Sequence, residues 1–229
     1  MTRSSRPSNR KLLVAGDGIV AAASAIYAGS RMDFFIYSRD APGTEALRDD
    51  DDLREEHWSY MDGFGDAMIA RGPTLAPDRE TATGSLHVLA LPSVAAANEF
   101  VEREPNNRAG VYADHRILGF ENLLGRTMWE FTGEPDEPRF LVVAHSGHDQ
   151  SEPVPWRPVR PVALGVELRE RLIVYGALTE PESGETVGVA FALQAPDRHA
   201  AMALLRAGAP GLDAFRAVEL HDWEFGGRR

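Results

Sequence analysis

Residues 68–75 read MIARGPTL and residues 172–179 read LIVYGALT, so one apolar pattern with a glycine at its fifth position occurs twice. A turn-rich stretch and then an apolar predicted strand follow each occurrence, Ser85–Leu91 in the first and Thr186–Leu193 in the second. A repeated unit constrains the architecture more firmly than local propensity does. We therefore expect two copies of one module.

Further landmarks repeat around these segments. A predicted helix follows each strand, and the residue before it is a type favoured at helix N-caps: Ser93 before Val94–Glu102, and Asp197 before Arg198–Arg206. Each copy also opens on an apolar strand, Asp33–Ser38 or Arg139–His145, and closes on the tripeptide WEF, at 129–131 or 223–225. The landmarks thus agree over about 90 residues in each copy.

The predicted order in each copy is β-α-β-β-α-β. That order is typical of the ferredoxin-like module, in which helices cover one face of a four-stranded antiparallel sheet and leave the other face free to pack on a second sheet. The predicted fold class is therefore α+β, with two tandem ferredoxin-like modules packed as a pseudo-dimeric α/β barrel. The expected domains are a weakly ordered extension (1–31), a first module (32–131), a proline-rich acidic linker (132–138) and a second module (139–229).

Composition excludes several classes of function. The chain of 229 residues has a formal net charge of −11, which argues against nucleic-acid and anionic-membrane partners because these need clustered basic residues. It has no cysteine, which excludes disulfides, thiolate metal sites and cysteine nucleophiles. It also lacks an apolar span of about 18 residues, so we expect no membrane helix and a cytoplasmic location.

The first residues allow more than one interpretation. The apolar stretch 12–28 contains Asp17, which argues against a signal peptide. Gly16, Gly18 and Ala21 form a GxGxxA pattern, and Asp40 lies where a dinucleotide-binding fold places its ribose-binding acid. That interpretation needs Phe34–Ser38 as the second strand of a parallel sheet. The leading interpretation is an extension that binds no ligand.

One predicted helix of the first copy carries a candidate catalytic residue. We expect this helix to run from Leu53 to Ala70, with the acidic run Asp49–Asp52 at its start because acids stabilise the positive end of the helix dipole. One apolar face follows the helical period: His57, Tyr60, Met61, Phe64 and Met68. That face is expected to point at the sheet, and His57 is either a packed residue or part of a site.

Short motifs of the first copy resemble the YciI-like (YCII-related) family over residues 32–121. They are 54-REEH-57, 70-ARGP-73, 84-GS-85, 92-PS-93, 104-EP-105 and 110-GVY-112. The resemblance implies a ferredoxin-like module that dimerises into an α/β barrel, with a histidine on the first helix paired to the aspartate of an Asp-Pro-Tyr motif. His57 matches the first position. Glu104-Pro105-Asn106 departs from the second, because it has a longer carboxylate and no tyrosine.

A histidine–carboxylate pair suits acid–base chemistry, because imidazole titrates near neutral pH and the carboxylate fixes its tautomer. The predicted catalytic residues are therefore His57 and Glu104. The predicted substrate-binding residues are Arg71, Gly72, Pro73, His87 and His115, with His87 and His115 placed either inside the barrel, beside Arg71 or Arg116, or at its surface.

The second copy lacks these residues. Pro161 aligns with His57, prolines shorten the first helix of this copy, and no counterpart of Glu104 exists, so the second copy is predicted to be structural. His145, His148 and Asp149 have metal-ligand side chains but no distant third ligand, so we predict no metal. The usual serine hydrolase, zincin and P-loop motifs are absent from the sequence.

The predicted function is that of a small-molecule enzyme without a cofactor, in which His57 is a general acid or base. The resemblance implies isomerisation, elimination or hydrolysis, including dehalogenation, of a small substrate that can be cyclic. The alternative is a noncatalytic small-molecule-binding or scaffold protein, and the third hypothesis is dinucleotide binding by the GxGxxA segment. The expected partner is a small organic molecule, and a homodimer of the pseudo-dimer is left open.

Overall fold

The computed structural model describes residues 31–145 and 157–227. Gly16, Gly18 and Ala21 of the GxGxxA pattern lie outside the described residues, as do His148 and Asp149. No helix in the described ranges combines the length and the apolar character that crossing a membrane requires.

The elements follow one another in the order strand, helices, two strands, helices, strand in each half. The first half holds β1 (Met32–Asp40), α2 (Glu45–Arg48), α3 (Asp51–Asp62), β2 (Met68–Leu75), β3 (Ala82–Leu91), α4 (Val94–Arg103), α5 (Pro105–Arg108), β4 (Tyr112–Asn122) and the 3-10 turn η1 (Met128–Glu130). The second half holds β5 (Arg139–His145), η2 (Pro161–Ala163), α6 (Val166–Arg171), β6 (Leu172–Thr179), β7 (Thr186–Gln194), α7 (Arg198–Gly208), η3 (Leu212–Ala214) and β8 (Ala217–Trp223).

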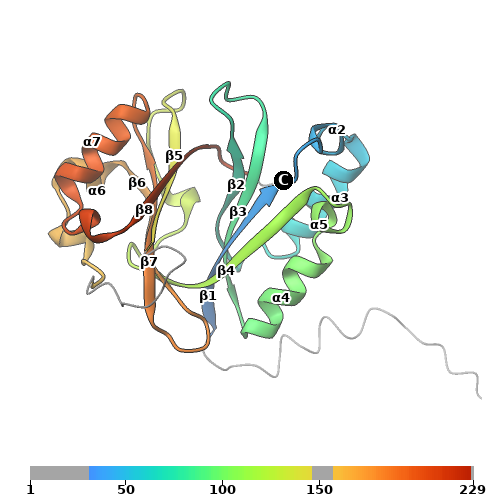
Figure 1. The fold of residues 1–229 in the computed structure, drawn as a ribbon, viewed down its shortest axis with the longest axis horizontal. Helices are drawn as coiled ribbons and strands as arrows, with labels where there is room; N and C mark the ends of the chain where they lie inside the picture. The colour runs from blue at the N-terminus through green and yellow to red at the C-terminus, as the bar shows by residue number, and fades with distance from the viewer. Residues whose placement is uncertain (1–30, 146–156, 228–229) are drawn as a thin grey trace, which may run out of the picture. The chain divides into compact units, whose positions relative to one another are not determined.

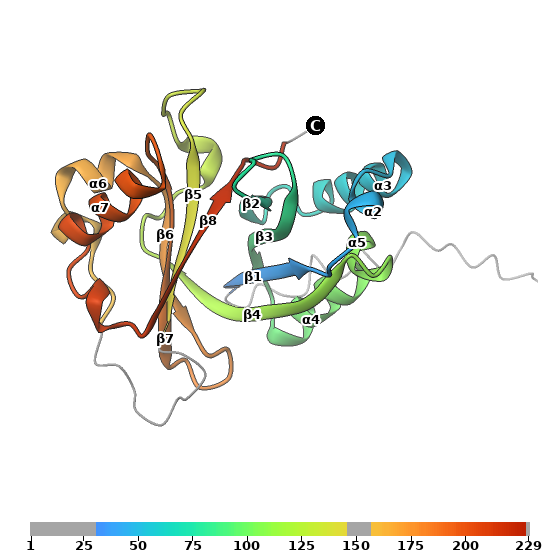
Figure 2. The ribbon, with the colours of Figure 1, turned by 45° about the horizontal axis from the view of Figure 1, so that its top comes forward.

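The strands form one closed antiparallel barrel in the order β1-β3-β2-β8-β5-β7-β6-β4. The two halves join at β2–β8, where Thr74 pairs with Trp223, and at β4–β6, where Gly119 pairs with Thr179. Helices α3 to α5 lie outside the strands of the first half, and α6 and α7 outside those of the second (Figures 1 and 2). The chain therefore has an α+β fold built on an eight-stranded antiparallel sheet.

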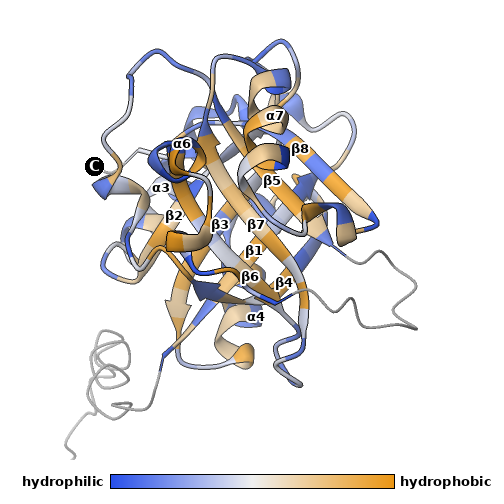
Figure 3. Cartoon of the chain, turned by 90° about the vertical axis from the view of Figure 1, so that its left-hand side faces the viewer, coloured by the Kyte–Doolittle hydropathy of each residue, from blue (hydrophilic) through white to orange (hydrophobic). Residues whose placement is uncertain are grey.

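Alternation along the strands separates the core into an inner and an outer part. On β1, Phe35 and Tyr37 point into the barrel, whereas Phe34 and Ile36 pack outward under the helices of the first half. The second half has its own outer cluster beneath α6 and α7. Hydrophobic residues consequently lie on both faces of most strands. Figure 3 shows the resulting hydrophobic colouring along the strands.

Several predicted elements are confirmed. The repeated segments are the equivalent strands β2 and β6, and Arg139–His145 is β5 with the predicted bounds. Ser93 and Asp197 cap α4 and α7, since the side chain of each accepts a hydrogen bond from a backbone N–H of the first turn. In the acidic run, Asp50 is the N-cap of α3. The first helix of the second half is short, with six residues in α6.

Two predictions about elements were wrong. The helix expected over Leu53–Ala70 ends at Asp62, because the chain turns at Gly63 and then pairs with β3 from Met68 onward. Strand pairing, which a local helical period cannot reveal, decides the structure there. The two WEF tripeptides are not equivalent either. Trp129 lies in the turn η1 after β4, whereas Trp223 ends strand β8.

Candidate functional site

Helix α3 and the start of α5 bring His57 and Glu104 together. His57 Nδ1 lies 2.5 Å from Glu104 Oε1, and the carboxyl group is almost fully buried with 2% of its side chain exposed. Glu104 also caps α5, because its Oε2 accepts a hydrogen bond of 2.8 Å from the backbone N–H of Asn107. A carboxylate held at both oxygens fixes the ring of His57 and keeps its Nδ1 as the donor. The Nε2 atom is then the one left for proton exchange.

His57 lies in the wall of a cavity of about 580 Å³, which is within the size range of small-molecule sites. The cavity is lined by helices α2, α3 and α5, strands β2 and β3 with the turn between them, and the segment that follows β8. Residues that line it include Arg48, His57, Trp58, Arg71, Gly72, Pro73, Ser85, His87, Phe225, Gly226 and Gly227. The predicted residues His57, Arg71, Gly72, Pro73 and His87 thus share one cavity.

Arg71, Gly72 and Pro73 hold the segment after β8 against the cavity. The backbone carbonyl of Arg71 accepts a hydrogen bond of 2.8 Å from Gly226 N–H, and its guanidinium donates to Asp62 Oδ1 at 3.1 Å and to the carbonyl of Gly227. Gly72 has φ of 154°, and a Cβ atom there would lie 1.8 Å from the carbonyl oxygen of Glu224. Only glycine allows this close approach.

The second half therefore contributes a wall of the cavity, through Phe225, Gly226 and Gly227. The expectation of a purely structural second half missed this contribution. The adjacent glycines at 226 and 227 were the local signal for a close approach of backbones, but nothing in their sequence names the strand that they approach.

His87 lies under the helices and not inside the barrel. Its neighbours Leu86 and Val88 point into the barrel, so the ring of His87 points outward, where it packs edge-on against Phe100 of α4 and lies 6.0 Å from the ring of His57. Only 3% of His87 is exposed. Burial, reinforced by the electrostatic effects of His57 and Arg48, holds the pKa of His87 well below its ordinary value.

His115 is outside the cavity lining. Its Nδ1 lies 2.9 Å from Ser38 Oγ and its Nε2 2.8 Å from Asn107 Oδ1, so both ring nitrogens are occupied on the helix-covered side of β4. The amide oxygen of Asn107 can only accept, which places the proton of the neutral ring on Nε2. Burial lowers the pKa of His115. Its position supports Asn107, and through it the end of α5 that begins at Glu104.

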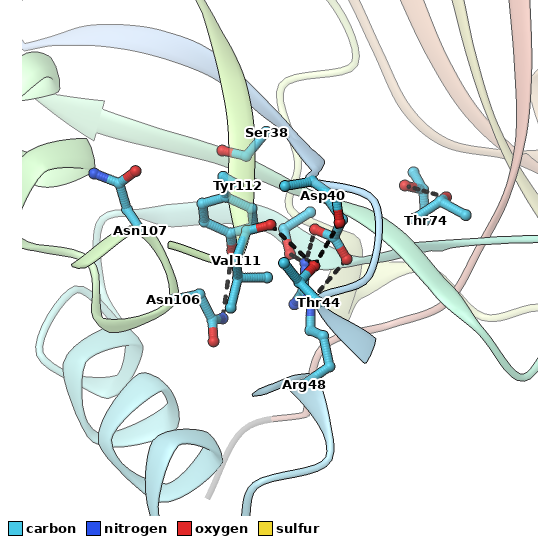
Figure 4. Close-up of polar contacts among 12 residues, drawn as sticks. Ser38, Asp40, Thr44, Arg48, Thr74, Asn106, Asn107, Val111 and Tyr112 are labelled. Atoms are coloured by element: carbon cyan, nitrogen blue, oxygen red, sulfur yellow. Dashed lines mark hydrogen bonds and ion pairs between the residues drawn. The ribbon is translucent and has the colours of Figure 1, made fainter. Parts of the chain in front are cut away.

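A second polar network supports the cavity from beneath. Arg48 donates to both carboxylate oxygens of Asp40, at 2.9 and 2.5 Å, and to Ser85 Oγ at 3.1 Å. Its guanidinium also lies 5.2 Å from the centre of the ring of Tyr112, whose pKa is raised by burial. Figure 4 shows Asp40, Thr44 and Arg48 close together beside Tyr112. Arg48 is thereby fixed at the cavity by partners on β1 and β3.

This network and the sheet do not support the dinucleotide hypothesis. Asp40 is engaged by Arg48, and the strand that contains Phe34–Ser38 pairs antiparallel with both β3 and β4. The hypothesis needed that strand in a parallel sheet with a crossover helix. It was therefore wrong about the sheet around Phe34–Ser38.

Inside the barrel, a separate polar cluster surrounds Glu219 of β8. His145 Nε2 lies 2.7 Å and His221 Nε2 3.3 Å from its carboxylate, and Arg116 donates to it at 3.5 Å. The hydrogen bond with His221 is the main reason that the pKa of Glu219 falls to about 2. Arg116 thus lies here and not at the cavity. The described residues contain no group of three or more His, Asp or Glu side chains placed to hold a metal ion.

Comparison with known proteins gives one family match, within the first half. Residues 32–121 match the model of the YCII-related domain. No curated protein matches the chain. Three solved structures are similar. The first is 5-chloro-2-hydroxyhydroquinone dehydrochlorinase from Burkholderia phenoliruptrix AC1100 with 2,5-dihydroxybenzoquinone (29% identity, 38% of this chain, 90% of that chain, TM-score 0.34). The second is an anthrone oxidase-like protein (13% identity, 87% of this chain, 93% of that chain, TM-score 0.46). The third is a protein described as a monooxygenase from Lactobacillus acidophilus NCFM (5% identity, 86% of this chain, 94% of that chain, TM-score 0.45).

Proposed function

We propose that the protein, whose residues 32–121 are a YCII-related domain, is a small-molecule enzyme in which His57 acts as general acid or base. The observation that carries the proposal is the contact of 2.5 Å between His57 Nδ1 and the buried Glu104 at the wall of the cavity. A positioned imidazole of this kind contributes about 10²–10⁴-fold to a proton-transfer step. Glu104 acts through His57 as a positioning residue.

The chemistry that fits one such imidazole is proton transfer to or from carbon or oxygen, as in isomerisation, elimination or hydrolysis. Each of these reactions needs a group that removes a proton at one stage and returns it, or delivers it elsewhere, at another. The residues around the cavity supply that group at Nε2 of His57, and the basic side chains Arg48 and Arg71 lie close to it. The proposed reaction uses no redox cofactor.

We also propose that the chain is a fused pseudo-dimer of two ferredoxin-like modules, residues 32–131 and 139–229. The supporting observation is the strand order, since β4-β1-β3-β2 in one half and β8-β5-β7-β6 in the other place equivalent strands in equivalent positions. Only the first module carries the histidine and the carboxylate. The second module closes the barrel and supplies the segment Phe225–Gly227 to the cavity.

Turnover of a panel of small lactones and halogenated ring compounds, followed by NMR, tests the enzyme hypothesis. We expect His57→Gln to lower the rate at least about 100-fold with unchanged folding, and Glu104→Gln to lower it less, because the amide oxygen still accepts from Nδ1. His199→Gln, on the exposed face of α7, is the matched control. Binding without turnover in the wild type would favour the noncatalytic alternative, and full activity in His57→Gln would exclude His57 as the acid or base.

A further inference from the structure

His87 is a buried polar side chain whose hydrogen bonding is incomplete. It is 3% exposed, and its Nδ1 has no hydrogen-bond partner among the described residues. A buried polar group without a hydrogen-bond partner is unfavourable, so its presence in the fold needs an explanation. His87 also lines the cavity that His57 shares. Nδ1 is sealed from the cavity, so Nε2 is the ring nitrogen through which His87 can meet a ligand there.

Charges around the cavity are divided between its floor and its rim. The acidic residues that line it, Glu45, Asp49 and Glu80, are exposed at the rim. The buried floor carries Arg71, with 6% of its side chain exposed, and Arg48, with 15%. Each guanidinium keeps an ion pair with one carboxylate, Arg48 with Asp40 and Arg71 with Asp62, and the Nη1 atoms of both donate to no described residue. Further N–H donors are therefore left at the floor. A ligand with an anionic oxygen complements this floor.

His87 remains neutral beside these cations and so offers one donor and one acceptor nitrogen. A proton on the sealed Nδ1 would be a buried donor without an acceptor, which costs more than an unpaired lone pair there. The proton therefore belongs on Nε2. A neutral N–H donor at the floor can bind an anionic oxygen without exchanging its own proton with water.

We propose that the cavity binds a small oxyanion, a carboxylate or a phenolate or enolate, and that His87 donates a hydrogen bond from Nε2 to the charged oxygen. This inference rests on the proposed function, since it assigns a substrate class to the same cavity. The volume of about 580 Å³ and the aromatic side chains Trp58 and Phe225 in its wall suit a single planar ring as the body of the ligand.

The test is calorimetric titration of the full chain with three one-ring probes: benzoate, ionised 4-nitrophenolate and neutral benzamide. We expect at least one anion to bind more tightly than benzamide, and the better anion distinguishes a carboxylate from a phenolate site. His87→Leu should weaken that binding about tenfold or more, whereas His87→Gln should keep it within a few-fold, because the Gln amide reaches the position of Nε2. Exposed His199→Leu is the matched control and should bind like the wild type.

Thermal denaturation separates a binding role from a structural one. We expect His87→Leu to keep or raise Tm, because an apolar side chain removes the unpaired nitrogen from beside Phe100. A lower Tm together with lost binding would mean that His87 is a structural residue, and equal binding of benzamide and the anions would also overturn the proposal. If His87→Leu does not fold, His87→Asn replaces it, since its amide reaches only the Nδ1 position and should bind weakly. Because the probes are not turned over, a lack of catalysis would count against the proposed function alone.

Discussion

Gly72→Ala tests the contact through which the second half completes the cavity. The Cβ atom of alanine would lie 1.8 Å from the carbonyl oxygen of Glu224 and 2.8 Å from the backbone nitrogen of Gly226, and both neighbours are backbone. The segment after β8 must therefore move away from β2. That movement breaks the hydrogen bonds from Gly226 to Arg71 and from Glu224 to Pro73.

The expected loss of stability can be summed from two effects. A non-glycine residue at φ of 154° costs about 1–3 kcal/mol in backbone strain. Two lost backbone hydrogen bonds cost about 0.5–1.5 kcal/mol each. Gly72→Ala should therefore lower the free energy of unfolding by about 4 kcal/mol, which corresponds to a decrease in Tm of about 8–16 °C for a chain of this size.

Urea unfolding followed by far-UV circular dichroism measures this loss. Gly43→Ala is the matched control, because Gly43 also has positive φ, 83°, but a Cβ atom there meets nothing within 4 Å, so only the strain of about 1–2 kcal/mol remains. The difference between the two variants isolates the clash. If Gly72→Ala is no less stable than Gly43→Ala, the segment after β8 does not lie against β2 as described.

Three further predictions concern pH and helix capping. Glu219 has a pKa of about 2 in the folded state and 4.5 in the unfolded state, so it stabilises the fold fully above pH 4.5 and this stabilisation is lost as the pH falls toward 2. Glu219→Gln should therefore lower the free energy of unfolding at pH 7 by about 1–2 kcal/mol, after allowance for partial exposure. Its acid unfolding profile should also be flatter. The pKa of folded His87 lies well below 6.5, so unfolding takes up a proton below pH 6.5 and the free energy of unfolding falls as the pH decreases. His87→Leu should make this fall shallower between pH 6.5 and 5, and an unchanged slope would contradict burial of the neutral ring. Ser93→Ala should cost about 1 kcal/mol in urea unfolding through loss of the α4 cap, whereas Ser59→Ala, exposed within α3, should cost nothing measurable.

The repeat allowed most of the fold to be predicted from the sequence. Each copy of the repeated segment is a strand, because the same inward and outward packing is required of β2 and β6. The end of α3 was not predictable from local periodicity. The spacing of Met68 from His57 continues the helical apolar face. Met68 nevertheless lies on strand β2, from which it packs into the outer cluster that also contains Met61 of α3.

The site was only partly predictable for related reasons. His57 and Glu104 were found from family motifs, and the structure places them in hydrogen-bond contact. The orientation of His87 could not be read from alternation, because both faces of β3 are buried and the strand has no polar side to serve as a reference. The wall formed by Phe225 depends on contact with residues 151 positions away, as between Gly72 and Trp223, which no local pattern encodes.

The contact between Gly72 and the segment after β8 also sets an order of events during synthesis. Every other described element leaves the ribosome before residues 224–227, so the first module can fold around His57 and Glu104 while its cavity still lacks a wall. Closing a loop of this length costs about 4 kcal/mol of chain entropy, which the late pairing of β8 with β2 must overcome. Among the described residues, the wall of the cavity is consequently completed last, when the segment after β8 docks on β2.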